Sequence, residues 1–401
     1  MDDIFVARQP IYDRENQIIG YELLYRAGNT TIAEFSDGKL ASSQVILNSF
    51  LNIGFDGLIG STLAFINITE GFILDEALTL MYDKQIVLEI LEDIPPSSEV
   101  VAGVKRLKKQ GYKIALDDFQ YSPEYDELLL LADFVKLDVI DLSSEQMLRE
   151  LKNLTPYNAK IIAEKIETPE MYDFCKKAGF NYFQGFYFCK PQLVNINNIP
   201  ANKLVVLNLL KLLNKHDYDF NEIEKAISQD AVLTYKLLRY VNSAAFSQRK
   251  EVDSIKEALA LVGGDTIKKW VTLILTMQLA EGKPQALLIT ALVRAKMCEL
   301  LEEASDNNNG EMFTIGLFSL LDALMDVAMV ELLDDLTLSA EVKFAILDHQ
   351  GEKGELLDNV ICYEQGDWGY LSEQGIDAEI YLSSYMESVK WTDSTIESLQ
   401  E

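Results

Sequence analysis

The first half of the chain alternates short runs of apolar and β-branched residues with stretches of helical periodicity. The predicted strands are residues 18–25, 63–67, 86–90, 113–116, 134–137, 160–163 and 182–186. Helices are predicted between them, such as 100–109 before Gly111 and 169–178 before Gly179. Strands that alternate with helices favour a mostly parallel sheet. Nearly continuous apolar strands such as 113–116 are buried on both faces, as in a (β/α) barrel or a doubly wound sheet.

After Pro191 the pattern becomes helical almost throughout. The predicted helices are residues 201–215, 221–228, 233–241, 254–261, 266–279, 286–303, 312–324 and 340–347. The Asn-rich stretch 194–201 reads as a linker. We therefore predict an α/β (TIM-like) barrel over residues 1–195, followed by an all-α domain over residues 196–401. The polar runs 302–311 and 387–401 are predicted to be a solvated loop and a frayed tail.

Polar residues recur at the ends of the predicted strands, directly after apolar runs. They are Glu22, Asn67, Glu89, Asp117, Asp118, Lys136, Asp138, Glu164, Glu167 and Gln184. A single acidic residue at a strand end is usually a loop residue or a helix cap. In a parallel barrel, however, the carboxyl ends of the strands meet at one mouth, so these side chains are expected to form one ring.

The chemistry of this ring favours hard divalent cations. Carboxylate and amide oxygens without histidine suit Mg²⁺ or Mn²⁺ better than zinc. Two such ions, a water and a lysine are the usual equipment for in-line displacement at phosphorus. The residues therefore indicate phosphodiester hydrolysis.

Composition narrows the function classes. The 64 acidic and 35 basic side chains give a formal net charge of −29, which makes a non-specific DNA-binding protein a poor interpretation. The four cysteines contain no Cys-x-x-Cys pair, so a disulfide scaffold or a cysteine zinc site is not expected. No signal peptide and no apolar run of about 18 residues is visible, and we expect a cytoplasmic protein without a membrane span.

The motifs of the first half resemble those of the EAL domains, which hydrolyse the bacterial second messenger cyclic di-GMP to the linear dinucleotide. The resemblance covers about residues 4–192. The motifs that carry it, in chain order, are Gln9-Pro10-Ile11, Glu22-Leu23-Leu24 with Arg26, Asn67, Glu89 with Glu92, Asp117-Asp118-Phe119, Lys136-Leu137-Asp138, Glu164-Lys165-Ile166-Glu167 and Gln184-Gly185.

The resemblance implies a role for each of these positions. Glu22, Asn67, Glu89 and Asp117 would bind one metal ion and share Asp117 with a second ion, which Asp118 also holds. Lys136 would orient the attacking water, and Glu164 would be the general base. The remaining implied roles are support of the metal site by Glu167, ligand contacts by Gln9, Arg26 and Gln184, and anchoring of the following loop by Glu92.

Three departures from the family pattern lie within these motifs. A glycine-rich loop that shapes the metal site and the dimer follows Asp-Asp-Phe in the family, whereas residues 120–126 here read Gln-Tyr-Ser-Pro-Glu-Tyr-Asp. Glycine reaches backbone conformations that these residues do not reach easily, so the loop must take another path. Lys165 stands where the family has glycine, and Leu23 occupies the middle of the name-giving motif.

The second half resembles the HDOD domain, a helical relative of the HD metal-dependent phosphohydrolases. The matching residues lie within about 197–370, including Ile227, the stretch 236–243, Gly263-Gly264 and Trp270. HD chemistry needs several histidine ligands. This chain has only His216 and His349, which are expected at helix ends. We therefore expect a non-catalytic domain that binds a protein partner.

Two functions remain open at this point. In the first, the barrel hydrolyses cyclic di-GMP with two Mg²⁺ or Mn²⁺ ions, because every ligand position holds a competent residue. In the second, the barrel is a catalytically degenerate receptor or scaffold, because the loop 120–126 is altered. A homodimer is compatible with both, and an HD-type nucleotidase in the second half is excluded by its histidines.

Overall fold

The computed structural model describes residues 4–27, 59–75, 85–140, 142–185, 201–213, 263–280, 282–305, 310–336 and 338–400, with a few single positions between 227 and 258. Contacts divide the chain into two compact units. Unit 1 comprises Met1–Phe188 and Cys362–Met386, and unit 2 comprises Cys189–Ile361 and Glu387–Glu401. The linker 194–200, His216 and most of the predicted helices between 221 and 261 lie outside the described residues.

Unit 1 is built on a closed eight-stranded barrel whose strands follow one another in chain order. The strands are β1 (Ile4–Tyr12), β2 (Ile18–Ala27), β3 (Leu63–Ile68), β4 (Ile86–Ile90), β5 (Lys113–Leu116), β6 (Phe134–Asp138), β7 (Lys160–Glu164) and β8 (Tyr182–Phe183). β1 is antiparallel to both of its neighbours, and all other adjacent strands are parallel. The predicted TIM-like barrel is confirmed, with β1 as an additional strand.

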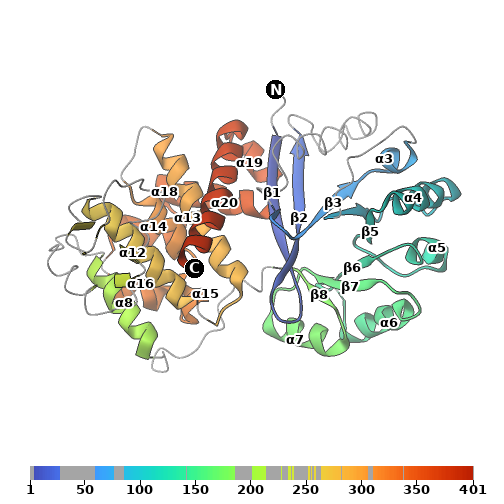
Figure 1. Ribbon diagram of the computed structural model, residues 1–401, viewed down its shortest axis with the longest axis horizontal. Coiled ribbons are helices and arrows are strands. Elements are labelled where there is room, and N and C mark those ends of the chain that lie inside the picture. Colours follow the sequence, from blue (N-terminus) through green and yellow to red (C-terminus); the bar gives the residue numbers. More distant parts are fainter. Residues whose placement is uncertain are drawn as a thin grey trace. The chain divides into compact units, whose positions relative to one another are not determined.

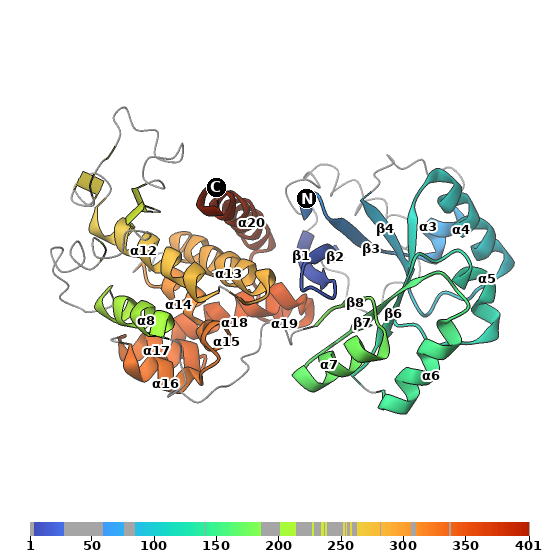
Figure 2. The same ribbon diagram turned by 60° about the horizontal axis from the view of Figure 1, so that its bottom comes forward.

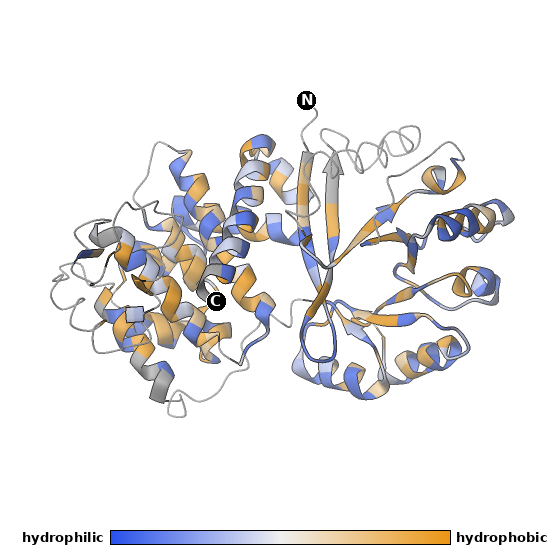
Figure 3. Ribbon diagram, viewed as in Figure 1, coloured by the Kyte–Doolittle hydropathy of each residue, from blue (hydrophilic) through white to orange (hydrophobic). Residues whose placement is uncertain are grey.

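Helices surround the strands, as Figures 1 and 2 show. They are α3 (Glu70–Leu74), α4 (Ser98–Gln110), α5 (Asp126–Leu129), α6 (Ser144–Leu154) and α7 (Pro169–Ala178). α4 begins where the Ser97 hydroxyl accepts a hydrogen bond from the Val100 N–H, and it ends at Gly111 in the left-handed conformation. In Figure 3 the strands are mostly hydrophobic, and hydrophilic residues colour one side of α4 and α6.

The barrel interior is filled by buried side chains from β1 and from β3 to β7. These are Ile11, Phe65, Val87, Ala115, Phe134 and Ile162. The rings of Phe65 and Phe134 pack edge to face with their centroids 5.2 Å apart. The interior is therefore a packed core, which leaves the carboxyl ends of the strands as the place for chemistry.

The open edge of β1 is covered by the C-terminal part of unit 1. Among the described residues, β1 pairs with β8 at Tyr12 and Phe183. The Tyr363 hydroxyl accepts a hydrogen bond from the Val6 N–H, and the Tyr385 hydroxyl accepts one from the Arg8 N–H. Helix α19 (Trp368–Glu373) lies beside β1 in Figure 1. The two tyrosine hydroxyls thus satisfy backbone N–H groups of β1.

Unit 2 is helical in its described part. Its helices are α8 (Ala201–Leu213), α12 (Gly264–Leu279), α13 (Gln285–Glu303), α14 (Met312–Phe318), α15 (Leu321–Met325), α16 (Met329–Asp335), α17 (Ala340–Leu347), most of α18 (Gly351–Gln365) and the end of α20 (Ala378–Gln400). The all-α prediction is confirmed. The prediction of a frayed tail at 387–401 is wrong, because α20 continues to Gln400 and buries Val389, Thr392 and Ile396.

His349 lies between α17 and α18, as expected for a helix-end residue. It has a positive φ of 54°, and its Nδ1 shares a hydrogen bond with the Asp358 carboxylate on α18. In the described residues, no helix combines the length and apolarity needed to cross a membrane.

Candidate active site

The barrel brings the predicted polar residues to one mouth through its strand register. Asn67 and Glu89 are neighbours across β3 and β4, and Asp138 and Glu164 are neighbours across β6 and β7. Gln9 on β1 lies opposite Glu22 on β2, and the other ring members stand on or directly after their strands. The common position after an apolar run thus becomes a common position in space.

Lys136 is the centre of this ring. Its ammonium nitrogen lies 3.0 Å from Glu22 Oε2, 3.0 Å from Glu89 Oε1, 2.8 Å from Asp117 Oδ1 and 2.8 Å from Glu164 Oε1. The lysine side chain is 1% exposed, and Glu89 is completely buried. Four carboxylates around one ammonium leave excess negative charge in a desolvated place, which a further cation would compensate.

Three of these carboxylates meet the geometric requirement for a cation site. One oxygen each of Glu22, Glu89 and Asp117 lies within 4.8 Å of the others. Among the described residues, the buried Oε2 of Glu89 and Oδ1 of Asn67 have no hydrogen-bond partner. Buried polar atoms normally have a partner. The unused oxygens and the all-oxygen donor set therefore fit a divalent cation.

Burial and neighbouring charges shift the pKa values of the ring residues in opposite directions. Burial raises the pKa of Glu89 and Asp117 against the opposing charge of Lys136, and it raises the pKa of Glu164 to about 8. Burial also acts on Glu22, but Lys136 and the hydrogen bonds of its neighbours prevail and lower its pKa. For Lys136, burial is outweighed by the carboxylates, which raise its pKa well above the usual value. Lys136 is therefore an ammonium, and the raised pKa of Glu164 keeps a proton on this carboxyl up to about pH 8 when no metal ion is bound.

Gln184 closes the ring at β8. Its Nε2 donates to Glu22 Oε2 at 2.8 Å and to Gln9 Oε1 at 3.1 Å, so it links β1, β2 and β8. Gly185 follows with a φ of 150°, and a Cβ there would lie 2.3 Å from the backbone oxygen of Ile166. Only glycine fits this close approach, which fixes the place of Gln184.

A second group of charges lies at the outer part of the mouth. Lys165, directly after β7, places its Nζ 2.5 Å from Asp138 Oδ2 and 3.4 Å from Asp118 Oδ2. Burial lowers the pKa of Lys165, but the hydrogen bond to Asp138 and the charge of Asp118 outweigh burial and raise it. Asp118 is thus close to a lysine ammonium, and it is not a member of the three-carboxylate group formed by the inner residues.

Three other predicted residues are not drawn into the buried ring. Glu167 and Glu92 are exposed at the mouth. Arg26 belongs to β2 opposite Phe5, and its side chain lies outside the described part of the chain. Their implied roles in metal support, loop anchoring and ligand contact stay predictions.

The altered loop 120–126 is held by contacts that the sequence did not indicate. The Tyr121 N–H donates to Glu150 Oε2 on α6 at 3.1 Å, and the Tyr121 and Tyr157 hydroxyls both donate to Asp126 Oδ1. None of residues 119–126 has a positive φ, so the loop takes a path that does not require glycine. Nothing in the pattern of α6 distinguishes Glu150 from an ordinary solvated helix residue.

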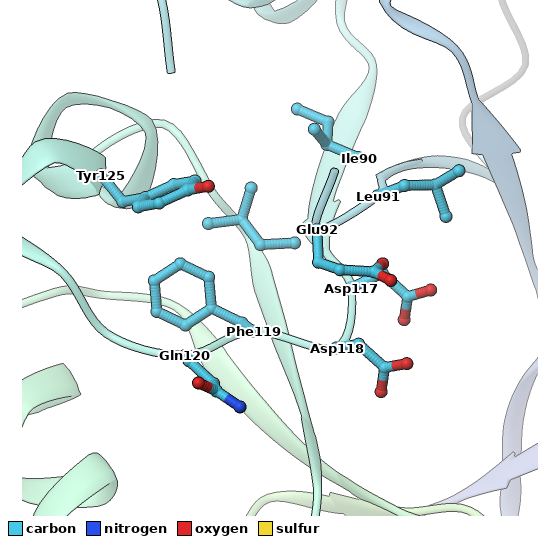
Figure 4. A pocket seen from close by; sticks show the side chains of 9 residues that line it. Ile90, Leu91, Glu92, Asp117, Asp118, Phe119, Gln120 and Tyr125 are labelled. Carbon is cyan, nitrogen blue, oxygen red and sulfur yellow. The ribbon is translucent and has the colours of Figure 1, made fainter. Parts of the chain in front are cut away.

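A cavity of about 310 Å³ lies between this loop and the strand ends. It is lined by residues 90–92, residues 116–120 and Tyr125. Figure 4 shows Glu92 and the Asp117–Asp118 pair on one side, with Phe119 and Tyr125 opposite. The rings of Phe119 and Tyr125 pack edge to face at 5.4 Å. Glu92 lines this cavity together with Gln120 of the loop, and its implied role as a loop anchor stays a prediction.

Comparison with known proteins identifies both halves. A model of the EAL domain matches residues 69–191, and a model of the HDOD domain matches residues 199–353. The uncharacterized protein YuxH of Bacillus subtilis (strain 168) is 32% identical over 98% of this chain and 99% of its own length. The cyclic di-GMP phosphodiesterase CdgJ of Vibrio cholerae serotype O1 is 30% identical over 97% of this chain and 92% of its own length.

Among solved structures, a standalone EAL protein from Vibrio cholerae O395 in its c-di-GMP-bound form is 22% identical. The match has a TM-score of 0.40 and covers 47% of this chain and 92% of that one. The two domain matches and the full-length similarity to YuxH and CdgJ agree with the resemblance seen in the motifs. The chain belongs to the family of proteins in which an EAL domain is followed by an HDOD domain.

Proposed function

We propose that the barrel is a cyclic di-GMP phosphodiesterase. The observation that carries this proposal is the juxtaposition of three carboxylates fit for a cation, Glu22, Glu89 and Asp117, with Lys136 and a Glu164 carboxyl whose pKa is raised to about 8. The full-length similarity to CdgJ, which is named for this activity, supports the substrate. The substrate would be the cyclic dinucleotide, and the product would be its linear form.

The residues present would hold Mg²⁺ or Mn²⁺ through Glu22, Glu89, Asp117 and the unused oxygen of Asn67. Such an ion, when bound, polarises the phosphodiester and lowers the pKa of a bound water. Lys136, fixed among the carboxylates, orients the attacking water. Glu164 would accept the proton of that water in its carboxylate form, which the positive charge of a bound ion would favour.

The side of the mouth formed by β1, β2 and β8 would bind the dinucleotide. Gln184 and Gln9 hydrogen-bond to each other and to Glu22, so they are held in place before a ligand arrives. Their remaining polar atoms are assigned to the ligand, together with Arg26 of β2. The cavity beside Asp117 and Asp118 gives room next to the reacting phosphodiester.

The test is hydrolysis of cyclic di-GMP by the purified full chain with Mn²⁺, alongside a separate binding measurement. Asp117→Asn is expected to abolish Mn²⁺-dependent hydrolysis. Glu164→Gln is expected to retain dinucleotide binding and to lose turnover by roughly 10²- to 10⁴-fold, the usual contribution of a general base. Activity that persists in both variants would disprove the assigned roles.

A receptor function is the second candidate, and a specific contact favours it. Lys165 neutralises Asp118 and Asp138 at the place where catalysis with two ions would need a second cation. A barrel that binds cyclic di-GMP with Mn²⁺ or Mg²⁺ present but shows no turnover would support this reading. The same experiment therefore decides between the two.

We further propose that the HDOD half is a non-catalytic output domain for a protein partner. The chain has two histidines, and His349 is engaged with Asp358. An HD-type metal site needs more histidine ligands than this. Stoichiometric transition metal that persists in a variant with the inner barrel carboxylates removed would contradict the assignment.

A further inference from the structure

Lys165 has a backbone conformation that lysine rarely adopts. Its φ is 55°, in the left-handed region where a residue with a Cβ is strained. Asp118, its partner across the mouth, also has a positive φ of 39°. Two strained residues that meet through their charged ends indicate that the contact compensates the strain.

The ammonium of Lys165 bridges two carboxylates, that of Asp138 at the end of β6 and that of Asp118 in the loop after β5. It lies 2.5 Å from Asp138 Oδ2 and 3.4–3.5 Å from the two oxygens of Asp118. The other oxygen of Asp138 accepts the Ile140 N–H, so Asp138 is held on both sides. A cation that joins two carboxylates in this way does what a bound metal ion does with the same ligands.

The inner and outer carboxylates form separate groups. In the part of the chain that the structure describes, Glu22, Glu89 and Asp117 form one cluster with cation-binding spacing, and Asp118 belongs to no such cluster. The outer pair of carboxylates carries the lysine charge already, so a divalent ion would meet reduced attraction there. The Lys165 side chain is about half exposed and its aliphatic stem is flexible. A second divalent ion would nevertheless have to displace the Lys165 ammonium from Asp118 and Asp138.

We propose that the Lys165 ammonium is a built-in cation that occupies the outer position between Asp118 and Asp138 and thereby limits the site to one tightly bound divalent ion at the inner carboxylates. The inference rests on the proposed metal-binding function of the inner cluster. It goes beyond that function because it assigns the number of ions and the residue that sets it.

The experiment measures the stoichiometry and affinity of Mn²⁺ binding by the full chain. Calorimetry gives both quantities, and electron paramagnetic resonance spectroscopy reports on the bound ions. Lys165→Asn removes the ammonium, and asparagine tolerates a positive φ. We expect one tight ion in the unmodified protein and two in Lys165→Asn, with the affinity of the second ion raised at least tenfold. Two neighbouring ions also give a spin-coupled spectrum that one ion cannot give.

Two further variants separate this role from general charge and from structure. Lys165→Arg keeps a cation and is expected to retain single-ion binding. Lys160→Gln removes an exposed lysine at the start of the same strand, β7, and is expected to leave the stoichiometry unchanged. A gain of the second ion in Lys160→Gln would assign the effect to net charge and overturn the proposal.

Equal stoichiometry in the unmodified protein and Lys165→Asn, or no Mn²⁺ binding by either, would also overturn the proposal. Hydrolysis is not part of this readout. If no variant turns over cyclic di-GMP but Lys165→Asn gains a second ion, the phosphodiesterase proposal fails and the role of Lys165 stands.

Discussion

Lys136 Nζ lies 3.0 Å from Glu89 Oε1, and the side chains of both residues are at most 1% exposed. Removing one partner of such a buried pair leaves an unpaired charge in a desolvated place. We expect Lys136→Met to destabilise the protein by about 3–5 kcal/mol in the presence of a chelator. Mn²⁺ should restore part of this loss, because a divalent ion supplies the missing positive charge.

Urea unfolding with and without Mn²⁺ measures this effect. Lys105→Met is the matched control, because Lys105 pairs with Glu127 at 3.0 Å on the exposed surface. That pair should contribute less than about 1 kcal/mol. Equal losses in the two variants would show that burial does not govern the strength of the Lys136 pairs.

The pKa of Glu164 predicts how stability depends on pH. The folded value is about 8 and the usual value is 4.5, so between these values the folded state holds a proton that the unfolded state has released. Stability from this group is complete below about pH 4.5 and is lost as the pH rises through about 8. The melting temperature of the chelator-treated protein should therefore fall between pH 5 and pH 9, roughly this window. Glu164→Gln should flatten the decline, and a slope equal to that of the unmodified protein would contradict the prediction.

Glu150 is predicted to fix the altered loop through the Tyr121 N–H. Glu150→Ala leaves this N–H without its acceptor, and the lost bond to a charged group amounts to about 1.5–3 kcal/mol. Hydrogen exchange at residues 119–126 should become roughly tenfold faster or more. Glu145→Ala removes an exposed carboxylate from the same helix and serves as the control. Similar exchange in both variants would argue against Glu150 as the anchor.

The close packing of Gly185 against Ile166 can be tested by substitution, with Gly179 as the comparison. Both have a positive φ, but a Cβ at Gly185 would collide with the backbone of Ile166, whereas a Cβ at Gly179 would meet nothing within 4 Å. Gly179→Ala should destabilise by about 1–2 kcal/mol through backbone strain alone. Gly185→Ala should destabilise more and should weaken dinucleotide binding, because Gln184 is displaced. Unchanged dinucleotide affinity would show that Gln184 does not touch the ligand.

The β1 edge is tested by removing single hydroxyl groups. Tyr385→Phe keeps the ring contact with Tyr363 and removes the acceptor of the Arg8 N–H. A buried N–H without an acceptor destabilises by about 1–3 kcal/mol. Protection of the Arg8 amide against hydrogen exchange should fall together with the free energy of unfolding. If protection is retained, another group satisfies this N–H.

The alternation of apolar runs and helices predicted a mostly parallel sheet but left a barrel and a doubly wound sheet open. The shared position of residues such as Glu22, Glu89 and Glu164 after those runs favoured the barrel and predicted the ring. β1 was missed because Arg8, Gln9 and Pro10 interrupt its apolar pattern. The tail helix was missed because its polar composition hid the spacing of Val389, Thr392 and Ile396. The contacts of Lys165 and Glu150 could not be predicted, since they join residues distant in sequence through side-chain geometry that no local pattern specifies.

The cover of β1 also has a consequence for synthesis on the ribosome. Tyr363 and Tyr385 follow their partners Val6 and Arg8 by 357 and 377 positions. At roughly 5–20 residues per second, the edge waits about 20–75 s for its cover. During that interval the Val6 and Arg8 N–H groups of the nascent barrel lack these hydroxyl acceptors, and exposed N–H groups on a strand can pair with other chains. Slow translation of the helical half should therefore favour aggregation of the barrel, and chaperones that shield strand edges should act before residue 386 emerges.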